Sequence, residues 1–126
     1  MNYLTAMSDI PEFATASLAK DQLYFPRPLM EDYLKEFKSN GVMAYAFLLN
    51  CLREPLDSVH KGQDDEGNTF VCFPNDDLAT VLNCSNPTVI SIKKLLTEKH
   101  LIEEVRQGSG KPNRIYLTDE ILSYYH

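Results

Sequence analysis

Basic side chains are concentrated in one part of this 126-residue chain, and their type and spacing suit the binding of a polyanion. The segment from residue 84 to residue 117 carries six basic and three acidic side chains, a net charge of +3. The remaining residues carry six basic and fifteen acidic side chains, which brings the total charge to −6. A polyanion responds to charges within a Debye length of about 8 Å rather than to the total. The distribution therefore favours a local anion-binding surface on an otherwise acidic protein.

A helix and a tight turn are predicted immediately before the basic segment. Asn75 is expected to cap a helix, with carboxylates in its first turn where they suit the helix dipole. The spacing of the apolar side chains predicts one stripe on this helix, made of Leu78, Val81 and Leu82. Asn83 then turns the chain.

A second helix is predicted from Asn86 to about His100. Pro87 is comfortable at a first helical position and disfavours helical geometry in its predecessor, so Asn86 is expected to be the cap rather than Ser85. At 100° per residue the helix has an inward and an outward side. The inward side is expected to hold Val89, Ile92, Leu96 and Lys99, and the outward side Asn86, Pro87, Ile90, Ser91 and Lys94.

Two short strands are predicted after the helices, at residues 102–106 and 114–117, with a flexible Gly-rich basic loop between them. Helix, turn, helix, strand, basic loop and strand form the order of a winged helix-turn-helix. The predicted fold class is α+β, mainly helical with a small antiparallel β-wing. Such a helix fits the major groove of DNA, and a basic hairpin can lie along the neighbouring phosphates.

The candidate DNA-binding side chains come from the second helix and the hairpin. Amides and hydroxyls can hydrogen-bond base edges, whereas lysines and arginines attract phosphates. Two alternatives stay open: Thr88 could bond its own backbone, and Arg106 could pair with a neighbouring glutamate. The candidates are Asn86, Thr88, Ser91, Lys93, Lys94, Arg106, Lys111, Asn113 and Arg114.

The rest of the chain supplies the core. Residues 1–20 are expected to form a flexible N-terminal arm, and residues 21–126 a winged-helix domain. A short amphipathic helix is predicted at 29–37 and is broken by Ser39-Asn40-Gly41. The next predicted helix, at 42–54, is apolar nearly all round, so it is buried either in this chain's core or partly against a dimer partner. A solvated acidic loop (60–68), a β-prone run (69–73) and a last helix (121–125) follow.

No signature of an enzyme, a metal site or a cofactor site is found in the sequence. The three cysteines are far apart and form no Cys-x-x-Cys pair, so they are expected to be reduced and buried. The acidic run at 64–66 has the side chains of a metal site, but its Gly-Asn setting favours a solvated loop. Without a membrane-length apolar run or a basic n-region near the start, the protein is expected to be cytoplasmic.

Three strings carry a resemblance to a known family: LATVLNCS at 78–85, TVI at 88–90 and, above all, RQGSGKPNRIY at 106–116. Over about three quarters of the chain, from Phe25 to Leu117, the sequence resembles the N-terminal domain of the replication initiator A family of Gram-positive bacterial plasmids. The resemblance implies a homodimer that binds repeats in a plasmid origin, and a region outside this chain that recruits host replication proteins. Family members often carry basic residues where this chain has Asn86, Pro87 and Ser91, so a weaker attraction to phosphates is expected.

Two other functions fit the same pattern. A winged-helix transcription regulator would use the same fold, since fold alone does not fix function. A protein–protein module of a replication complex would instead use the acidic surface and the polar start of the second helix.

Overall fold

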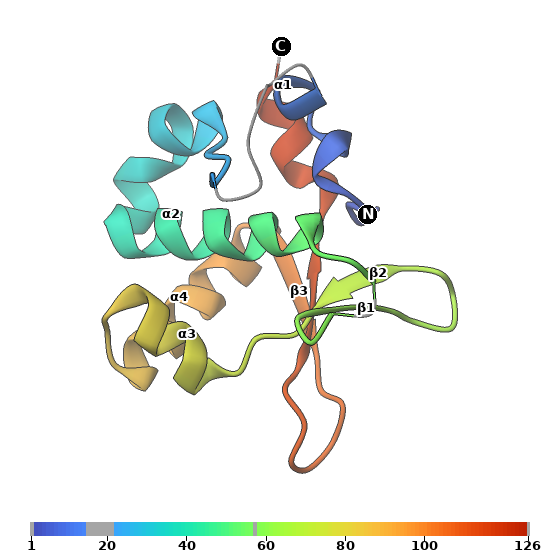
Figure 1. Ribbon diagram of the computed structural model, residues 1–126. Helices are drawn as coiled ribbons and strands as arrows, with labels where there is room; N and C mark the ends of the chain where they lie inside the picture. Colours follow the sequence, from blue (N-terminus) through green and yellow to red (C-terminus); the bar gives the residue numbers. More distant parts are fainter. Residues whose placement is uncertain (1, 15–21, 57, 126) are drawn as a thin grey trace.

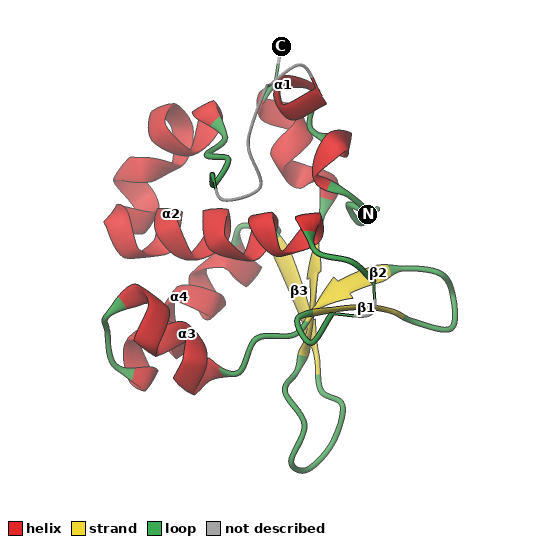
Figure 2. Cartoon of the chain, viewed as in Figure 1, coloured by secondary structure: helices red, strands yellow, loops and turns green. Residues whose placement is uncertain are grey.

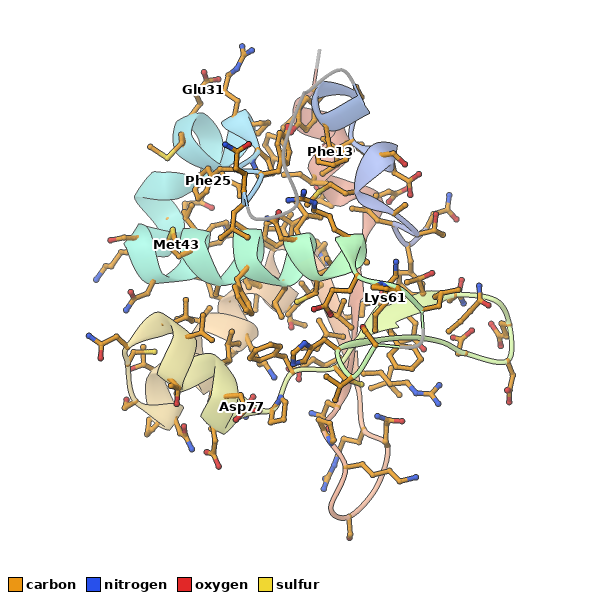
Figure 3. All side chains as sticks on the ribbon, in the orientation of Figure 1. Phe13, Phe25, Glu31, Met43, Lys61 and Asp77 are labelled. Carbon is orange, nitrogen blue, oxygen red and sulfur yellow. The ribbon has the colours of Figure 1, made fainter. Side chains whose placement is uncertain are left out.

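A long kinked helix, α2 (Leu34–Asn50), crosses the middle of the molecule and packs on the elements above and below it (Figure 1). The structure is a computed structural model, and it describes residues 2–14, 22–56 and 58–125. Over residues 42–50, the C-terminal part of α2, most side chains are buried, which confirms the interpretation that this apolar segment belongs to the core of its own chain. Met43 is an exception, with 47% of its surface exposed (Figure 3). The buried set is Val42, Ala44, Tyr45, Ala46, Leu48 and Leu49.

The break expected between the predicted helices at 29–37 and 42–54 lies elsewhere. A π-helical turn, η2 (Leu29–Tyr33), runs directly into α2, and the kink falls at Lys38, whose φ is 56°. The prediction of a break at residues 39–41 is therefore wrong by one to three residues. Gly41 has a packing role instead, because a Cβ at this position would lie 2.7 Å from the Cβ of Phe37. A short 3₁₀ turn, η3 (Cys51–Arg53), ends this part of the chain.

Below α2 lie the two helices of the turn motif, α3 (Asn75–Leu82) and α4 (Asn86–Glu98), beside a small sheet (Figure 2). Asn83 ends α3 in the left-handed conformation, with φ 54°, which confirms the predicted turn. The sheet contains β1 (Lys61–Gln63), β2 (Thr69–Val71), β3 (Ile102–Val105) and β4 (Arg114–Leu117) in the order β1-β2-β4-β3, with every pair antiparallel. The predicted α+β class with a small antiparallel wing is confirmed.

The N-terminal residues pack on the core above α2. They form η1 (Met7–Asp9) and α1 (Pro11–Ala14), beside the C-terminal 3₁₀ helix η4 (Asp119–Tyr124). Tyr3 pairs with Thr118 in an isolated bridge, and the most buried N-terminal side chains are Leu4, Met7 and Ile10. The expectation of a flexible arm is therefore wrong over residues 2–14, because three apolar side chains spaced three residues apart enter the core. Residues 15–20 lie outside the described residues.

Two local features differ from the sequence prediction. The loop predicted at 60–68 contains β1, which escaped prediction because Lys-Gly-Gln has no apolar alternation. The last helix is a 3₁₀ helix that starts at Asp119 and is capped by the hydroxyl of Thr118. Within the described ranges, no helix is long and apolar enough to cross a membrane.

Candidate nucleic-acid interface

The helix α4 begins with a side-chain cap from Ser85. Its Oγ accepts a hydrogen bond from the backbone N–H of Thr88 at 3.3 Å, and the two hydroxyls lie 2.9 Å apart. The prediction that Asn86 caps this helix is wrong by one residue. Pro87 is tolerated at the second helical position because the N–H groups of the first turn have no helical partner to lose. The hydroxyl of Thr88 contacts the hydroxyl of Ser85 and not a backbone group, so a contact of Thr88 with DNA stays a prediction.

The start of α3 differs in the same way. Asn75 is the first helical residue rather than the cap, and Pro74 precedes it as the cap residue. Asp76 follows in the first turn, and its carboxylate accepts a hydrogen bond from the side-chain amide of Asn86. The turn motif is thus tied together at the N-terminal ends of both helices. Sequence reasoning missed Asp76 because the contact spans ten residues.

The two faces of α4 are largely as predicted. Val89, Ile92 and Leu96 are buried. Ser91 and Lys94 are exposed, together with Asn86, Pro87 and Ile90. Lys99 is an exception to the predicted inward side, because it is exposed and its Nζ lies 3.3 Å from a carboxylate oxygen of Glu36. Val81 on α3 is likewise 47% exposed rather than part of the core stripe.

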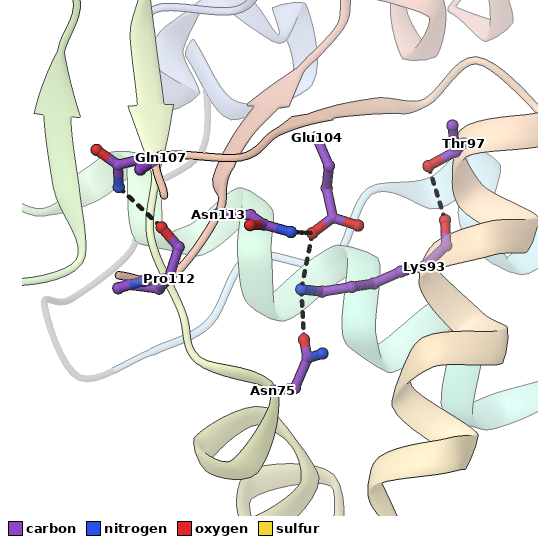
Figure 4. A network of polar contacts seen from close by, with 7 residues as sticks. All are labelled: Asn75, Lys93, Thr97, Glu104, Gln107, Pro112 and Asn113. Atoms are coloured by element: carbon purple, nitrogen blue, oxygen red, sulfur yellow. Dashed lines mark hydrogen bonds and ion pairs between the residues drawn. The ribbon is translucent and has the colours of Figure 1, made fainter. Parts of the chain in front are cut away.

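Lys93 requires the largest correction among the candidate residues. Its surface is only 6% exposed, and its ammonium group lies 2.6 Å from Oδ1 of Asn75 and 3.0 Å from Oε2 of Glu104 (Figure 4). The expectation that Lys93 shares the solvated face with Lys94 is wrong. One residue along a helix corresponds to 100° of rotation, which turns Lys93 toward β3 and Lys94 toward solvent.

The wing, defined here as the loop 106–113 between β3 and β4, projects from the lower end of the molecule (Figure 1). Gly108 and Gly110 have φ values of 117° and 77°, a conformation that glycine adopts without a steric penalty. The side chain of Gln107 crosses the base of the loop and donates to the carbonyl of Pro112 at 2.8 Å. The base of the wing is therefore held by a hydrogen bond across the loop, and the tip beyond it is exposed.

The remaining wing candidates differ in their exposure. Arg106 and Lys111 are exposed. Asn113 is half-buried and donates to Oε2 of Glu104 at 3.2 Å. Arg114 is also half-buried: its Nε donates to Gln107 at 3.2 Å, and its guanidinium carbon lies 4.6 Å from the ring centroid of Phe70. Sequence reasoning missed Phe70 and Gln107, because neither a ring beneath an arginine nor a brace across a loop has a sequence signature.

Three cations of the basic segment are both exposed and without a carboxylate partner among the described residues: Lys94, Arg106 and Lys111. They lie on α4 and on the wing, and the wing forms the lower end of the molecule in Figure 1. A polar hollow of about 370 Å³ separates the start of α3 from the wing and is lined in part by Asp76, Gly110 and Lys111. These three cations can attract the phosphates of a nucleic acid that lies against α4 and the wing.

Three ionisable groups near the sheet have pKa values that are shifted by burial or by hydrogen bonds. Burial raises the pKa of the Cys72 thiol. Burial and a hydrogen bond to Asp64 raise the pKa of Tyr116. Burial alone would raise the pKa of Asp64, but hydrogen bonds from Tyr116 and from two backbone N–H groups lower it. In the described part of the chain, no three His, Cys, Asp or Glu side chains form a group that could hold a metal ion.

Two helices joined by a tight turn and followed by a β-hairpin define a winged helix-turn-helix domain. The chain belongs to the family described as "Replication initiator protein A (RepA) N-terminus", whose model matches residues 22–124. No curated protein sequence matches the chain.

Solved structures support the same fold. One, described as "Structure of Rep-DNA complex", is 25% identical, with a TM-score of 0.62 over 86% of this chain and 78% of that chain. A second, "N-Terminal domain of DNA binding protein", is 24% identical, with a TM-score of 0.60 over 98% and 91%. A third, "Structure of MDR initiator", is 24% identical, with a TM-score of 0.53 over 90% and 88%.

Proposed function

We propose that this domain binds double-stranded DNA at the repeats of a plasmid origin, as the DNA-binding part of a replication initiator. The observation that carries the proposal is a set of exposed cations on α4 and the wing that have no carboxylate partner within the described part of the chain: Lys94, Arg106 and Lys111. Family membership and the similarity to a Rep protein in complex with DNA support it. The proposal assigns no enzymatic activity to the domain.

In the proposed complex, the exposed face of α4 enters the major groove. Ser91 offers a hydroxyl to base edges, and Asn86, whose side-chain NH2 donates to Asp76, offers its side-chain oxygen. Lys94 lies one further turn along the same face as Ser91. Arg106 and Lys111 of the wing neutralise phosphates of the adjacent backbone. A homodimer would place two copies of α4 in successive major grooves, so the spacing of the helices would set the spacing of the half-sites. Host replication proteins would bind a region outside this chain, and the complex would form in the cytoplasm.

Salt dependence tests the proposal. Three phosphate contacts per monomer predict a slope of about −2.7 in a plot of log affinity against log salt, which is about 40-fold between about 50 and 200 mM salt. Fluorescence anisotropy with labelled origin repeats and with a duplex of unrelated sequence measures both affinities. A protein that binds no duplex in a salt-dependent way would refute the proposal.

Two substitutions separate phosphate contacts from base contacts. Lys111→Ala should weaken binding to all sequences alike and make the salt slope shallower by about 0.9. Ser91→Ala should leave the slope unchanged and alter the preference between origin and unrelated DNA. If Lys111→Ala changed sequence preference and left the slope intact, the assignment of the wing to the phosphate backbone would be wrong.

A further inference from the structure

Three parts of the proposed interface meet at one buried ammonium group. Lys93 belongs to α4, and its Nζ donates to Oδ1 of Asn75, the first residue of α3, at 2.6 Å. The same Nζ donates to Oε2 of Glu104 on β3 at 3.0 Å (Figure 4). Oε2 of Glu104 also accepts from the side-chain amide of Asn113, the last residue of the wing, at 3.2 Å. A single chain of charge-assisted bonds thus links both helices of the turn motif to the wing.

The charged groups of this hydrogen-bond network are largely buried, which restricts how far α4, β3 and the wing base can move relative to one another. The side chain of Lys93 is 7% exposed and that of Glu104 is 23% exposed. A buried charge is stable only with its partners in place, and removing one partner leaves the other uncompensated. The ammonium group is therefore held where it satisfies Asn75 and Glu104 together. Movement of β3 or of the wing base relative to α4 would break at least one of these bonds.

The tip of the wing has little else to orient it. A Cβ added at Gly108 or Gly110 would meet nothing within 4 Å, and Lys111 at the tip is exposed. The Gln107–Pro112 brace joins the two sides of the loop to each other. Gln107 also donates to Sγ of Cys72 at 3.5 Å, and neither contact reaches α3 or α4. Among the described residues, the hydrogen bonds that join Lys93, Glu104 and Asn113 form the polar link between α4 and the wing.

We infer that Lys93 is a positioning residue that fixes the wing against α3 and α4, so that Lys111 and the exposed face of α4 engage one duplex together. This inference rests on the proposed function for its effect on DNA. Lys93 then acts without contacting a phosphate, and Glu104 and Asn113 help to position the wing through their hydrogen bonds.

A double-substitution experiment in the full chain tests the role of Lys93. The probe is a short DNA duplex of mixed sequence, with affinity measured across a salt series. Lys93→Met should make the salt slope shallower by about 0.9, because Lys111 no longer reaches its phosphate. Lys93→Met combined with Lys111→Ala should give no further change. The matched control is the neighbouring Lys94→Met, whose effect on the slope should add to that of Lys111→Ala.

Two results would overturn the inference. If the effects of Lys93→Met and Lys111→Ala on the slope add, Lys93 neutralises a phosphate of its own. If Lys93→Met lowers stability and leaves the slope unchanged, its role is only structural. Should Lys93→Met fail to fold, Asn113→Ala replaces it: this change removes no charge, so a slope shallower by about 0.9 supports positioning and an unchanged slope refutes it.

A measurement without DNA separates this inference from the proposed function. The heteronuclear NOE of the backbone amides of Ser109 and Lys111 reports motion of the wing tip. It should fall in Lys93→Met and in Asn113→Ala and stay at the wild-type value in Lys94→Met. An unchanged NOE in Lys93→Met and Asn113→Ala overturns the inference even if the wild-type domain binds DNA. Absence of salt-dependent binding by the wild type refutes the proposed function instead.

Discussion

The cap of α4 at Ser85 allows stability and DNA binding to be changed separately at one position. Ser85→Ala removes the hydroxyl that accepts from the N–H of Thr88 at 3.3 Å. The loss of such a cap costs about 1 kcal/mol. For a domain of this size, that corresponds to a fall in Tm of roughly 4 °C. Because alanine adds no charge, the affinity of the folded variant for DNA should stay close to that of the wild type.

Ser85→Asp should weaken DNA binding and leave the stability of the domain intact. Aspartate is a good N-cap, and its carboxylate suits the positive end of the α4 dipole, so Tm should not fall. The same carboxylate would face the duplex if the start of α4 enters the groove. A unit charge about 6 Å from a phosphate in water is repelled by about 0.7 kcal/mol, which weakens binding about threefold.

Thermal unfolding followed by circular dichroism and anisotropy on an origin repeat measure the two effects side by side. If Ser85→Ala unfolded at the wild-type temperature, the hydroxyl would not act as a cap. If Ser85→Asp bound DNA as tightly as the wild type, the N-terminal end of α4 would lie away from the duplex. The second result would remove Asn86 from the proposed interface together with Ser85.

Three further predictions concern the wing, the core and the sheet. Gly110→Ala should lower the free energy of unfolding by about 1 kcal/mol, because alanine is strained at a φ of 77°. The added Cβ would meet no atom within 4 Å, so no clash contributes. The neighbouring Ser109→Ala should leave the free energy of urea unfolding unchanged. Burial raises the pKa of Cys51 to about 12, so iodoacetamide should leave Cys51 unmodified in the native protein at about pH 8 and modify it after denaturation, as mass spectrometry would show. A hydrogen bond to Glu103 raises the pKa of Tyr3 from 10.0 to about 12, so its contribution to stability is complete below pH 10 and is lost as the pH rises to about 12. The urea midpoint should fall over this range, and by less in Glu103→Gln; equal falls in the two proteins would refute this linkage.

The sequence was sufficient for the elements whose periodicity and turn chemistry are local. The buried stripe of α4, the left-handed turn at Asn83 and the two strands around the wing each follow from spacing or from a residue's backbone preference. The cap at Ser85 was missed because both Ser85 and Asn86 are good caps, and Pro87 is compatible with either choice.

Errors arose where a contact between distant residues decides the outcome. Lys93 lies next to Lys94 in the sequence, but Glu104 and Asn75 turn it into the core. The N-terminal residues look irregular, but the bridge from Tyr3 to Thr118 places Leu4 in the core. Neither partner is visible in a local pattern, so a count of basic residues overstated the exposed charge of α4.

The acidic turn between β1 and β2 affects how the domain meets a polyanion before any contact forms. Asp65 and Glu66 are exposed there, and this hairpin projects to one side in Figure 1 while the wing projects downward. The field of an approaching duplex repels the hairpin and attracts the wing, which exerts a torque on the molecule. The domain therefore tends to meet DNA with its wing facing the duplex, although its net charge of −6 has the same sign as that of DNA.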